Sequence, residues 1–158
     1  MKPDYDIVII GGGLVGACMA GLLAASRPLS GLKLAVIEAH PPAQAPPGDI
    51  DIRVSALSHA SQKILKAAGG WQQLLPDQVS PYVDMVVWDA TTQPDGKGSI
   101  HFSAASTGEP DLGAIVENRR LQWALYCAPA FRERVVVLRA GLAGLAFDAG
   151  QGINTATL

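Results

Sequence analysis

Apolar residues along the first forty positions fall into two short runs separated by a helix-length stretch. Residues 6–10 form a short apolar run rich in isoleucine and valine, and three glycines follow it directly. A run of this kind is typical of a strand buried on both faces. Small and apolar residues over 14–26 then predict a helix, and 32–38 predicts a second buried strand. Strand, glycine turn, helix and strand together predict a βαβ unit of a parallel sheet.

Turn-forming residues interrupt this pattern after the second strand. Residues 41–48 hold four prolines and a glycine, which predicts an exposed, extended loop. The pattern over 58–68 predicts a helix capped by Ser58, ended by two glycines and followed by a short helix or turn at 71–75. The apolar face of that helix is expected to carry Ile64, Leu65 and Ala68.

Strand-like segments dominate the second half of the chain. A single helix is expected among them, over 119–127, with Asn118 as its N-cap. The predicted strands cover 82–90, 99–104, 112–117, 134–140, 142–149 and the final residues 153–158. Trp88 and Phe102, on the first two of these, are expected to pack in a core rather than to border a ligand cavity.

Composition narrows the class of protein. The chain has 158 residues, 49% of them apolar, which is enough for one domain with a buried core. Its 12 basic and 14 acidic residues argue against nucleic-acid binding, which normally requires a basic face. Cys18 and Cys127 lie far apart and form no C-x-x-C pair, so a reduced, cytosolic setting is expected. No apolar stretch reaches the length of a transmembrane segment.

The glycines after the first strand match G-x-G-x-x-G through Gly11, Gly13 and Gly16. In this motif the first glycine permits a tight turn, the second lets a pyrophosphate approach the backbone, and the third lets the helix pack close to the strand. The phosphates would bind the free N–H groups at the helix start, at Leu14 and Val15, where the helix dipole is positive. Because the motif follows a buried strand and opens a helix, it indicates dinucleotide binding.

Glu38 ends the second strand, 22 residues beyond Gly16. A carboxylate at that point accepts hydrogen bonds from an adenosine ribose, with Ala39 beside it. It also disfavours a 2′-phosphate, so NADP is not expected at this site. FAD and NAD both remain open on these residues.

Five segments in this order resemble the FAD-dependent aromatic hydroxylases of ubiquinone biosynthesis, within the p-hydroxybenzoate-hydroxylase-like flavoprotein monooxygenases. They are IVIIGGGLVGACMAGLLA, DIRVSALSHASQKILKAAGGW, SPYVDMVVWDA, IHFSA and LGAIVENRRLQWAL. The resemblance runs from about Asp6 to Leu125. It implies a Rossmann-like FAD-binding βαβ domain with the start of a β-rich substrate domain, an α/β fold.

The resemblance also implies roles for individual residues. Gly11, Gly13 and Gly16 would cradle the pyrophosphate of FAD, and Glu38 would bind the ribose. Arg53 would reach the FAD phosphates, where a guanidinium can grip two oxygens; the alternative is a surface arginine.

Two further residues are implied near the ribityl chain. Asn118 occupies the position where the family has a polar residue in this region; the alternative is a helix cap. Arg119 is a second candidate for the same region.

The chemistry implied is hydroxylation of a polyprenyl phenol or quinol by dioxygen, through a flavin hydroperoxide formed on FAD. The reductant is NAD(P)H or a protein electron donor, and other ubiquinone-biosynthesis proteins are expected as partners. The cofactor carries this chemistry, so no catalytic side chain and no metal is expected. His40, His59 and His101 are scattered and are expected to be structural or exposed. The polyprenyl tail implies a cytoplasmic protein that approaches the inner membrane from its surface.

The resemblance implies how the chain is divided between domains, and family members carry a further motif that this chain does not match. Residues 1–78 and 110–158 are expected to form part of the FAD-binding domain, with strands of the substrate domain inserted at 79–109. Family members carry a second FAD signature, a Gly-Asp pair, that nothing here matches. We therefore expect an N-terminal portion that binds FAD poorly alone and does not hydroxylate. Two other functions stay open: another FAD- or NAD-dependent oxidoreductase with the same start, and a non-catalytic binding module.

Overall fold

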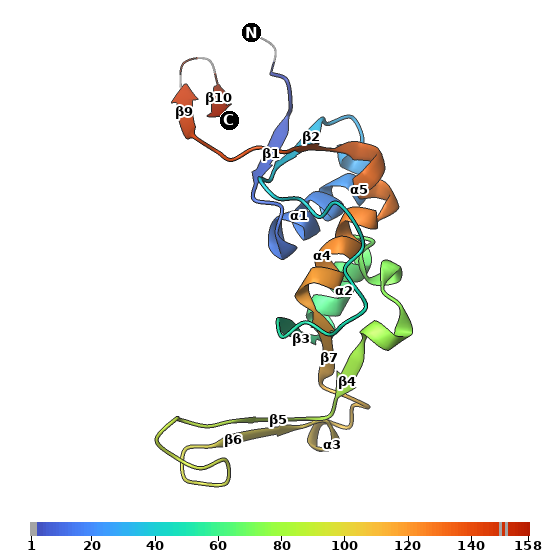
Figure 1. Ribbon diagram of the computed structural model, residues 1–158, viewed down its shortest axis with the longest axis vertical. Coiled ribbons are helices and arrows are strands. Elements are labelled where there is room, and N and C mark those ends of the chain that lie inside the picture. The colour runs from blue at the N-terminus through green and yellow to red at the C-terminus, as the bar shows by residue number, and fades with distance from the viewer. Residues whose placement is uncertain (1–2, 149, 151) are drawn as a thin grey trace.

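A three-stranded parallel sheet lies at one end of the molecule in the computed structural model, which describes residues 3–148, 150 and 152–158 (Figure 1). Its strand order is β1 (Ile7–Ile10), β2 (Leu34–Ile37), β8 (Val135–Leu138). Helix α1 (Leu14–Ala25) connects the first two strands, so the predicted βαβ unit and α/β class are confirmed.

The prediction that the first strand is buried on both faces is wrong. Central β2 is buried at every position, whereas Val8 and Ile10 of β1 are 41% and 48% exposed. The cause is position: β2 has a partner on each side, but among the described strands β1 pairs with β2 alone. The other two residues of β1 face the helices and pack against the core.

Four helices enclose the core: α1, α2 (His59–Ala67), α4 (Asn118–Cys127) and α5 (Pro129–Arg134). Helices α1 and α5 pack against the sheet, and α2 and α4 pack against α1. The buried face of α1 consists of small residues, which lets neighbouring helices approach closely. A Cβ added to Gly21 would lie 2.9 Å from the carbonyl oxygen of Ala68. The largest fully buried side chains belong to the strands and to α4 and α5: Leu34, Val36, Val116, Leu121, Leu125 and Phe131.

Helix α5 lies in a segment where the sequence pattern predicted no helix. Pro129 occupies its first turn, where proline is favoured because it needs no intrahelical N–H donor. At its end, Arg134 donates hydrogen bonds to the carbonyl oxygens of Ala24, Leu29 and Leu32. These carbonyls belong to the end of α1, the short helix η1 (Arg27–Leu29) and the turn before β2. One guanidinium thus fixes the connection between α1 and β2.

A second sheet lies below the helices in Figure 1 and is antiparallel, with the order β3 (Val54–Ser58), β7 (Gly113–Glu117), β4 (Ser80–Tyr82). Ser58 ends β3 and caps α2, accepting a hydrogen bond from Ser61 N at 3.3 Å, as predicted. The apolar face predicted for α2 is partly wrong: Leu65 is buried, but Ile64 is half-exposed. Gly69, with φ +81°, follows the helix, and η2 (Trp71–Gln73) and η3 (Pro76–Gln78) lead to β4.

The single strand predicted at 82–90 is divided at Val83. Strand β5 (Asp84–Val87) leaves the second sheet and pairs with β6 (Ile100–Ser103) in a ribbon that projects from the molecule (Figure 1). Because little packs on this ribbon, Trp88 and Phe102 are 47% and 49% exposed, and the prediction that they are core residues is wrong.

The remaining elements are short. Helix α3 (Ala104–Thr107) follows the ribbon, and the hairpin of β9 (Gly144–Asp148) and β10 (Ile153–Thr157) ends the chain. The predicted strand at 142–149 includes residue 149, which lies outside the described residues. Within the described part of the chain, no helix is long and apolar enough to cross a bilayer.

Candidate dinucleotide-binding site

The glycine turn lies at the carboxyl end of β1, where the chain enters α1. Gly11 has φ +93°, a left-handed conformation that favours glycine, and its N–H donates to Ile37 O at 2.9 Å. A Cβ on Gly16 would lie 1.8 Å from Gly11 O, so a larger residue would force the helix away from the strand. The turn and the close packing predicted from G-x-G-x-x-G are therefore both present.

Gly13 differs from these glycines because nothing in the protein requires its lack of a side chain. Its φ and ψ are −65° and −170°, an extended conformation open to any residue. A Cβ built on it would meet no atom within 4 Å. Gly13 is the N-cap of α1, with no side-chain hydrogen bond and no acidic residue in the first turn. The first-turn N–H groups, including those of Leu14 and Val15, are thus left for an external anion.

Glu38 lies beside this turn, at the end of β2. Its Oε2 accepts a hydrogen bond from Gly12 N at 2.7 Å and its Oε1 one from His40 N at 2.9 Å. These two backbone hydrogen bonds lower the pKa of the Glu38 carboxyl, and the bond from His40 has the larger effect. Each oxygen keeps acceptor capacity for a hydroxyl, because a carboxylate oxygen accepts more than one hydrogen bond. Ala39, next to it, is exposed.

Two side chains that the sequence did not single out contact the turn from α4. Gln122 Nε2 and Tyr126 Oη each donate to Gly12 O at 2.9 Å. They lie more than 100 residues from the glycines, and they stand one helical turn apart on one face of α4. Their spacing could be recognised in the sequence, but it does not show which residue the two side chains contact.

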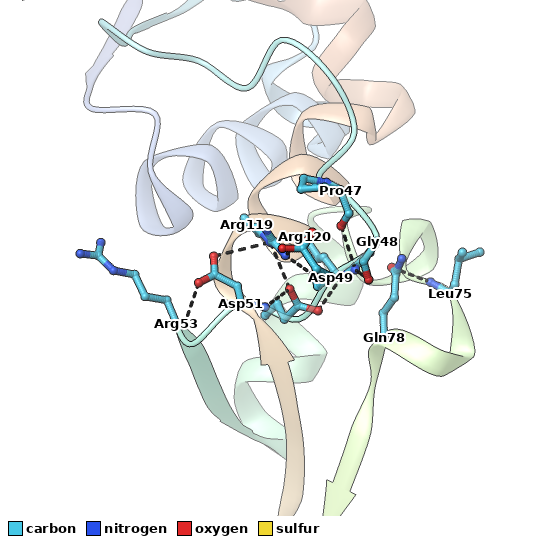
Figure 2. A network of polar contacts seen from close by, with 10 residues as sticks. Pro47, Gly48, Asp49, Asp51, Arg53, Leu75, Gln78, Arg119 and Arg120 are labelled. Atoms are coloured by element: carbon cyan, nitrogen blue, oxygen red, sulfur yellow. Dashed lines mark hydrogen bonds and ion pairs between the residues drawn. The ribbon is translucent and has the colours of Figure 1, made fainter.

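Arg53 is exposed and extends away from the other arginines, as Figure 2 shows. Its backbone is fixed: Arg53 N donates to Asp51 Oδ1 at 3.1 Å, and Arg53 O accepts from Asn118 N at 2.9 Å. With no partner for its guanidinium among the described residues, Arg53 can bind a phosphate or lie at the surface.

Arg119 and Arg120 form, with Glu117, a cluster that holds the proline-rich loop (Figure 2). Arg120 donates to Glu117 Oε1 at 2.6 Å and to the carbonyls of Pro47 and Gly48. Arg119 donates to the other oxygen of Glu117 at 3.1 Å and to Asp49 O, and it pairs with Asp51. The Arg119 guanidinium is therefore engaged with protein groups, which favours a role in holding the loop.

Asn118 is not the N-cap that one alternative predicted, since Glu117 occupies that position and Asn118 is the first residue of α4. Its Oδ1 accepts a hydrogen bond from Ser55 Oγ at 2.6 Å. The side chain thus links α4 to β3. This contact leaves the donor side of the amide for another group.

The side chains that bond to the glycine turn are those of Glu38, Gln122 and Tyr126, each through Gly12. No group of histidine, cysteine, aspartate or glutamate among the described residues is placed to hold a metal. His59 pairs with Asp111 at 2.7 Å and His101 with Asp84 at 2.9 Å, both away from the glycines. A bare glycine turn, a helix N-terminus and a carboxylate at the end of the second strand fit the adenosine diphosphate part of FAD.

These features define a dinucleotide-binding α/β domain. No family model matches the chain. The chain is 36% identical over 124 residues to 3-demethoxyubiquinol 3-hydroxylase of Escherichia coli, an alignment covering 78% of this chain and 29% of that protein. It is 35% identical over 116 residues to the mitochondrial ubiquinone biosynthesis monooxygenase COQ6 of Xenopus tropicalis, covering 72% and 24%. The predicted resemblance to ubiquinone hydroxylases is confirmed.

Solved structures share the fold. A flavin-dependent halogenase, Xcc4156 of Xanthomonas campestris, superposes with a TM-score of 0.67 at 14% identity, over 96% of this chain and 38% of that one. Aklavinone-11 hydroxylase, in a complex with FAD and aklavinone, gives a TM-score of 0.64 at 17% identity, over 99% and 30%. The chain thus spans 29% of the length of the Escherichia coli hydroxylase, 24% of the Xenopus monooxygenase, and 30% and 38% of the two solved structures.

Proposed function

We propose that this chain binds the adenosine diphosphate part of FAD in a flavoprotein monooxygenase that hydroxylates the aromatic ring of a polyprenyl phenol or quinol during ubiquinone biosynthesis. The observation that carries the proposal is Gly13. Its backbone is unstrained and its Cβ position is empty, so packing does not require a glycine at the start of α1, where the motif lets a pyrophosphate approach the backbone. Similarity to ubiquinone hydroxylases supports the choice of FAD and of the substrate class.

The chain's own residues would divide the work of binding. Gly11, Gly13 and Gly16 shape the turn, and the N–H groups of the first turn of α1 face the pyrophosphate. Glu38 would accept hydrogen bonds from the ribose, and Arg53 would bind the phosphates.

The second sheet would extend the site toward the rest of the flavin. Asn118, fixed by Ser55, would contact the ribityl region, and the cluster around Arg119 would hold the loop that carries Arg53. Residues 1–78 and 110–158 would form the FAD-binding part, and 79–109 would carry strands of the substrate domain, with the β5–β6 ribbon as their visible beginning.

The reaction needs groups that the chain binds rather than supplies. FAD, when bound and reduced, supplies the chemistry that transfers one oxygen atom of dioxygen to the ring. Electrons would come from NAD(P)H or from a protein donor. A polyprenyl substrate places the enzyme at the cytoplasmic surface of the inner membrane, together with other proteins of ubiquinone biosynthesis.

The test of cofactor binding uses ADP and 2′-phosphoadenosine 5′-diphosphate with the purified 158-residue chain. ADP should bind, and the 2′-phosphate should weaken binding about tenfold or more because of Glu38. Glu38→Gln should reduce that discrimination. Absence of ADP binding would overturn the proposal.

The reaction is tested on the full-length protein. Purified protein should be yellow, and dioxygen use should be coupled to the formation of a hydroxylated polyprenyl phenol. A colourless protein would favour the binding module instead. A yellow protein without hydroxylation would favour another flavin-dependent oxidoreductase.

A further inference from the structure

The peptide group between Gly12 and Gly13 is held from one side by two side chains. Gln122 Nε2 and Tyr126 Oη both donate to Gly12 O, each at 2.9 Å. On the other side of the same residue, Gly12 N donates to Glu38 Oε2 at 2.7 Å. Gly12 is buried and fits tightly, since a Cβ there would lie 2.1 Å from Tyr126 Oη. Gly12 is therefore fixed at both its N–H and its carbonyl.

Holding this carbonyl determines where the next N–H points. A trans peptide is planar, with its C=O and N–H on opposite sides. Because Gly12 O points toward α4, Gly13 N–H points away from α4, on the exposed side of the turn. Without the two donors, the flexible glycine backbone could rotate this peptide and lose the donor direction.

Tyr126 is suited to remain a donor. Burial, followed by the charge of Glu38, raises the pKa of its hydroxyl to about 12, so it stays protonated at physiological pH. Its ring lies 4.8 Å from that of Phe131, centroid to centroid, which limits its movement. The helix carrying both donors packs against α1 in the main core.

We propose that Gln122 and Tyr126 are positioning residues for the dinucleotide phosphates. By binding Gly12 O they hold the 12–13 peptide so that Gly13 N–H is directed at the pyrophosphate. The inference rests on the proposed function, because it assumes that the glycine turn binds a phosphate. The inference goes beyond the proposed function because it assigns the preorganisation of that turn to α4, a helix that is not part of the G-x-G-x-x-G motif.

The test compares ADP with adenosine, which lacks the phosphates, on Gln122→Leu, Tyr126→Phe and the double variant. Each substitution keeps the size of the side chain, and Tyr126→Phe keeps the ring beside Phe131. Loss of one donor should weaken ADP binding about 3- to 10-fold, and loss of both should weaken it more. Adenosine affinity should stay within about 2-fold, because the ribose contact with Glu38 does not depend on the phosphates.

Two variants serve as matched controls. Gln62 also donates to a backbone carbonyl, that of Leu57, but away from the turn, and Tyr82 lies on β4. Gln62→Leu and Tyr82→Phe should leave the ratio of ADP to adenosine affinity unchanged. A general loss of structure would lower both affinities together, whereas the positioning role lowers only that for ADP.

The outcomes separate this inference from the proposed function. If the wild-type chain binds ADP and the double variant binds it equally well, or loses ADP and adenosine affinity in proportion, the positioning role is refuted while the site stands. If the wild-type chain does not bind ADP, the proposed site itself fails, and this inference fails with it.

Discussion

Gly13→Ala and Gly16→Ala should separate ligand binding from folding within one motif. At Gly13 the added methyl group meets no atom within 4 Å, and φ of −65° is accessible to alanine. Alanine loses less backbone entropy on folding than glycine, about 0.4–1 kcal/mol, but it is less favourable than glycine at a helix N-cap. The two effects oppose each other, so the free energy of unfolding should change by less than about 1 kcal/mol. The same methyl group projects from the surface that we assign to the pyrophosphate. It should therefore weaken ADP binding by about tenfold or more, equivalent to about 1.4 kcal/mol.

Gly16→Ala should instead lower the stability of the protein strongly. Its Cβ would lie 1.8 Å from Gly11 O and 3.3 Å from Ile9 Cγ2, so α1 and β1 must move apart. The atom it meets is backbone, which cannot rotate away as a side chain could. We expect a loss of about 3 kcal/mol or more in the free energy of unfolding.

The assay combines urea unfolding, followed by circular dichroism, with ADP titration of each variant. Gly31→Ala is the matched control, because Gly31 also has an open Cβ position and no positive φ but lies in the turn after η1. Gly31→Ala should gain about 0.4–1 kcal/mol of stability and keep the wild-type affinity for ADP. If Gly13→Ala loses more than about 1 kcal/mol of stability, or binds ADP like the wild type, the reasoning from the empty Cβ position is refuted.

Three further predictions concern arginine and carboxylate contacts. Arg134→Met should lower the free energy of unfolding by about 2–4 kcal/mol, since three carbonyls lose a charged donor; exposed Arg132→Met should change it little. Hydrogen bonds, the strongest from Arg120, lower the pKa of the Glu117 carboxyl below its ordinary value of 4.5. The charged carboxylate therefore stabilises the fold fully above pH 4.5, and this stabilisation is lost as the pH falls below 4.5. Urea unfolding across pH 3–6, about the range of the carboxyl transition, should show a shallower acid decline for Glu117→Gln. Arg53→Ala should weaken ADP binding about tenfold and change the free energy of unfolding by less than about 0.5 kcal/mol. If the variant binds ADP as tightly as the wild type, Arg53 is a surface arginine without a role in binding.

Local signals in the sequence predicted the glycine turn and its supporting elements. Gly11, Gly16 and Glu38 act within one βαβ unit, so their spacing along the chain fixes their spacing in space. Ser58 caps α2 as predicted for the same reason, because a cap bonds within one turn of itself. At these residues the contact is local, and the residue pattern was sufficient to predict it.

Contacts made across the fold were not predictable in this way. Asn118 has the composition of a helix cap, but the pairing of β3 with β7 places Ser55 beside it, and the side chain binds there instead. Gln122 and Tyr126 reach Gly12 only because α4 packs along α1. Trp88 and Phe102 show the converse: their apolar character predicted burial, but the ribbon that carries them has no covering layer among the described residues.

The outer edge of β1 has a consequence for handling the protein in solution. No described strand pairs with that edge, and Val8 and Ile10 beside it are 41% and 48% exposed. An unpaired edge presents a row of backbone donors and acceptors that a second chain can join by extending the sheet. Self-association at high protein concentration is therefore expected to begin at this strand, a few residues from the glycine turn. Each ligand titration should therefore be accompanied by light scattering at the same protein concentration. A second chain paired with the edge of β1 would lie next to the glycine turn and could hinder the ligand.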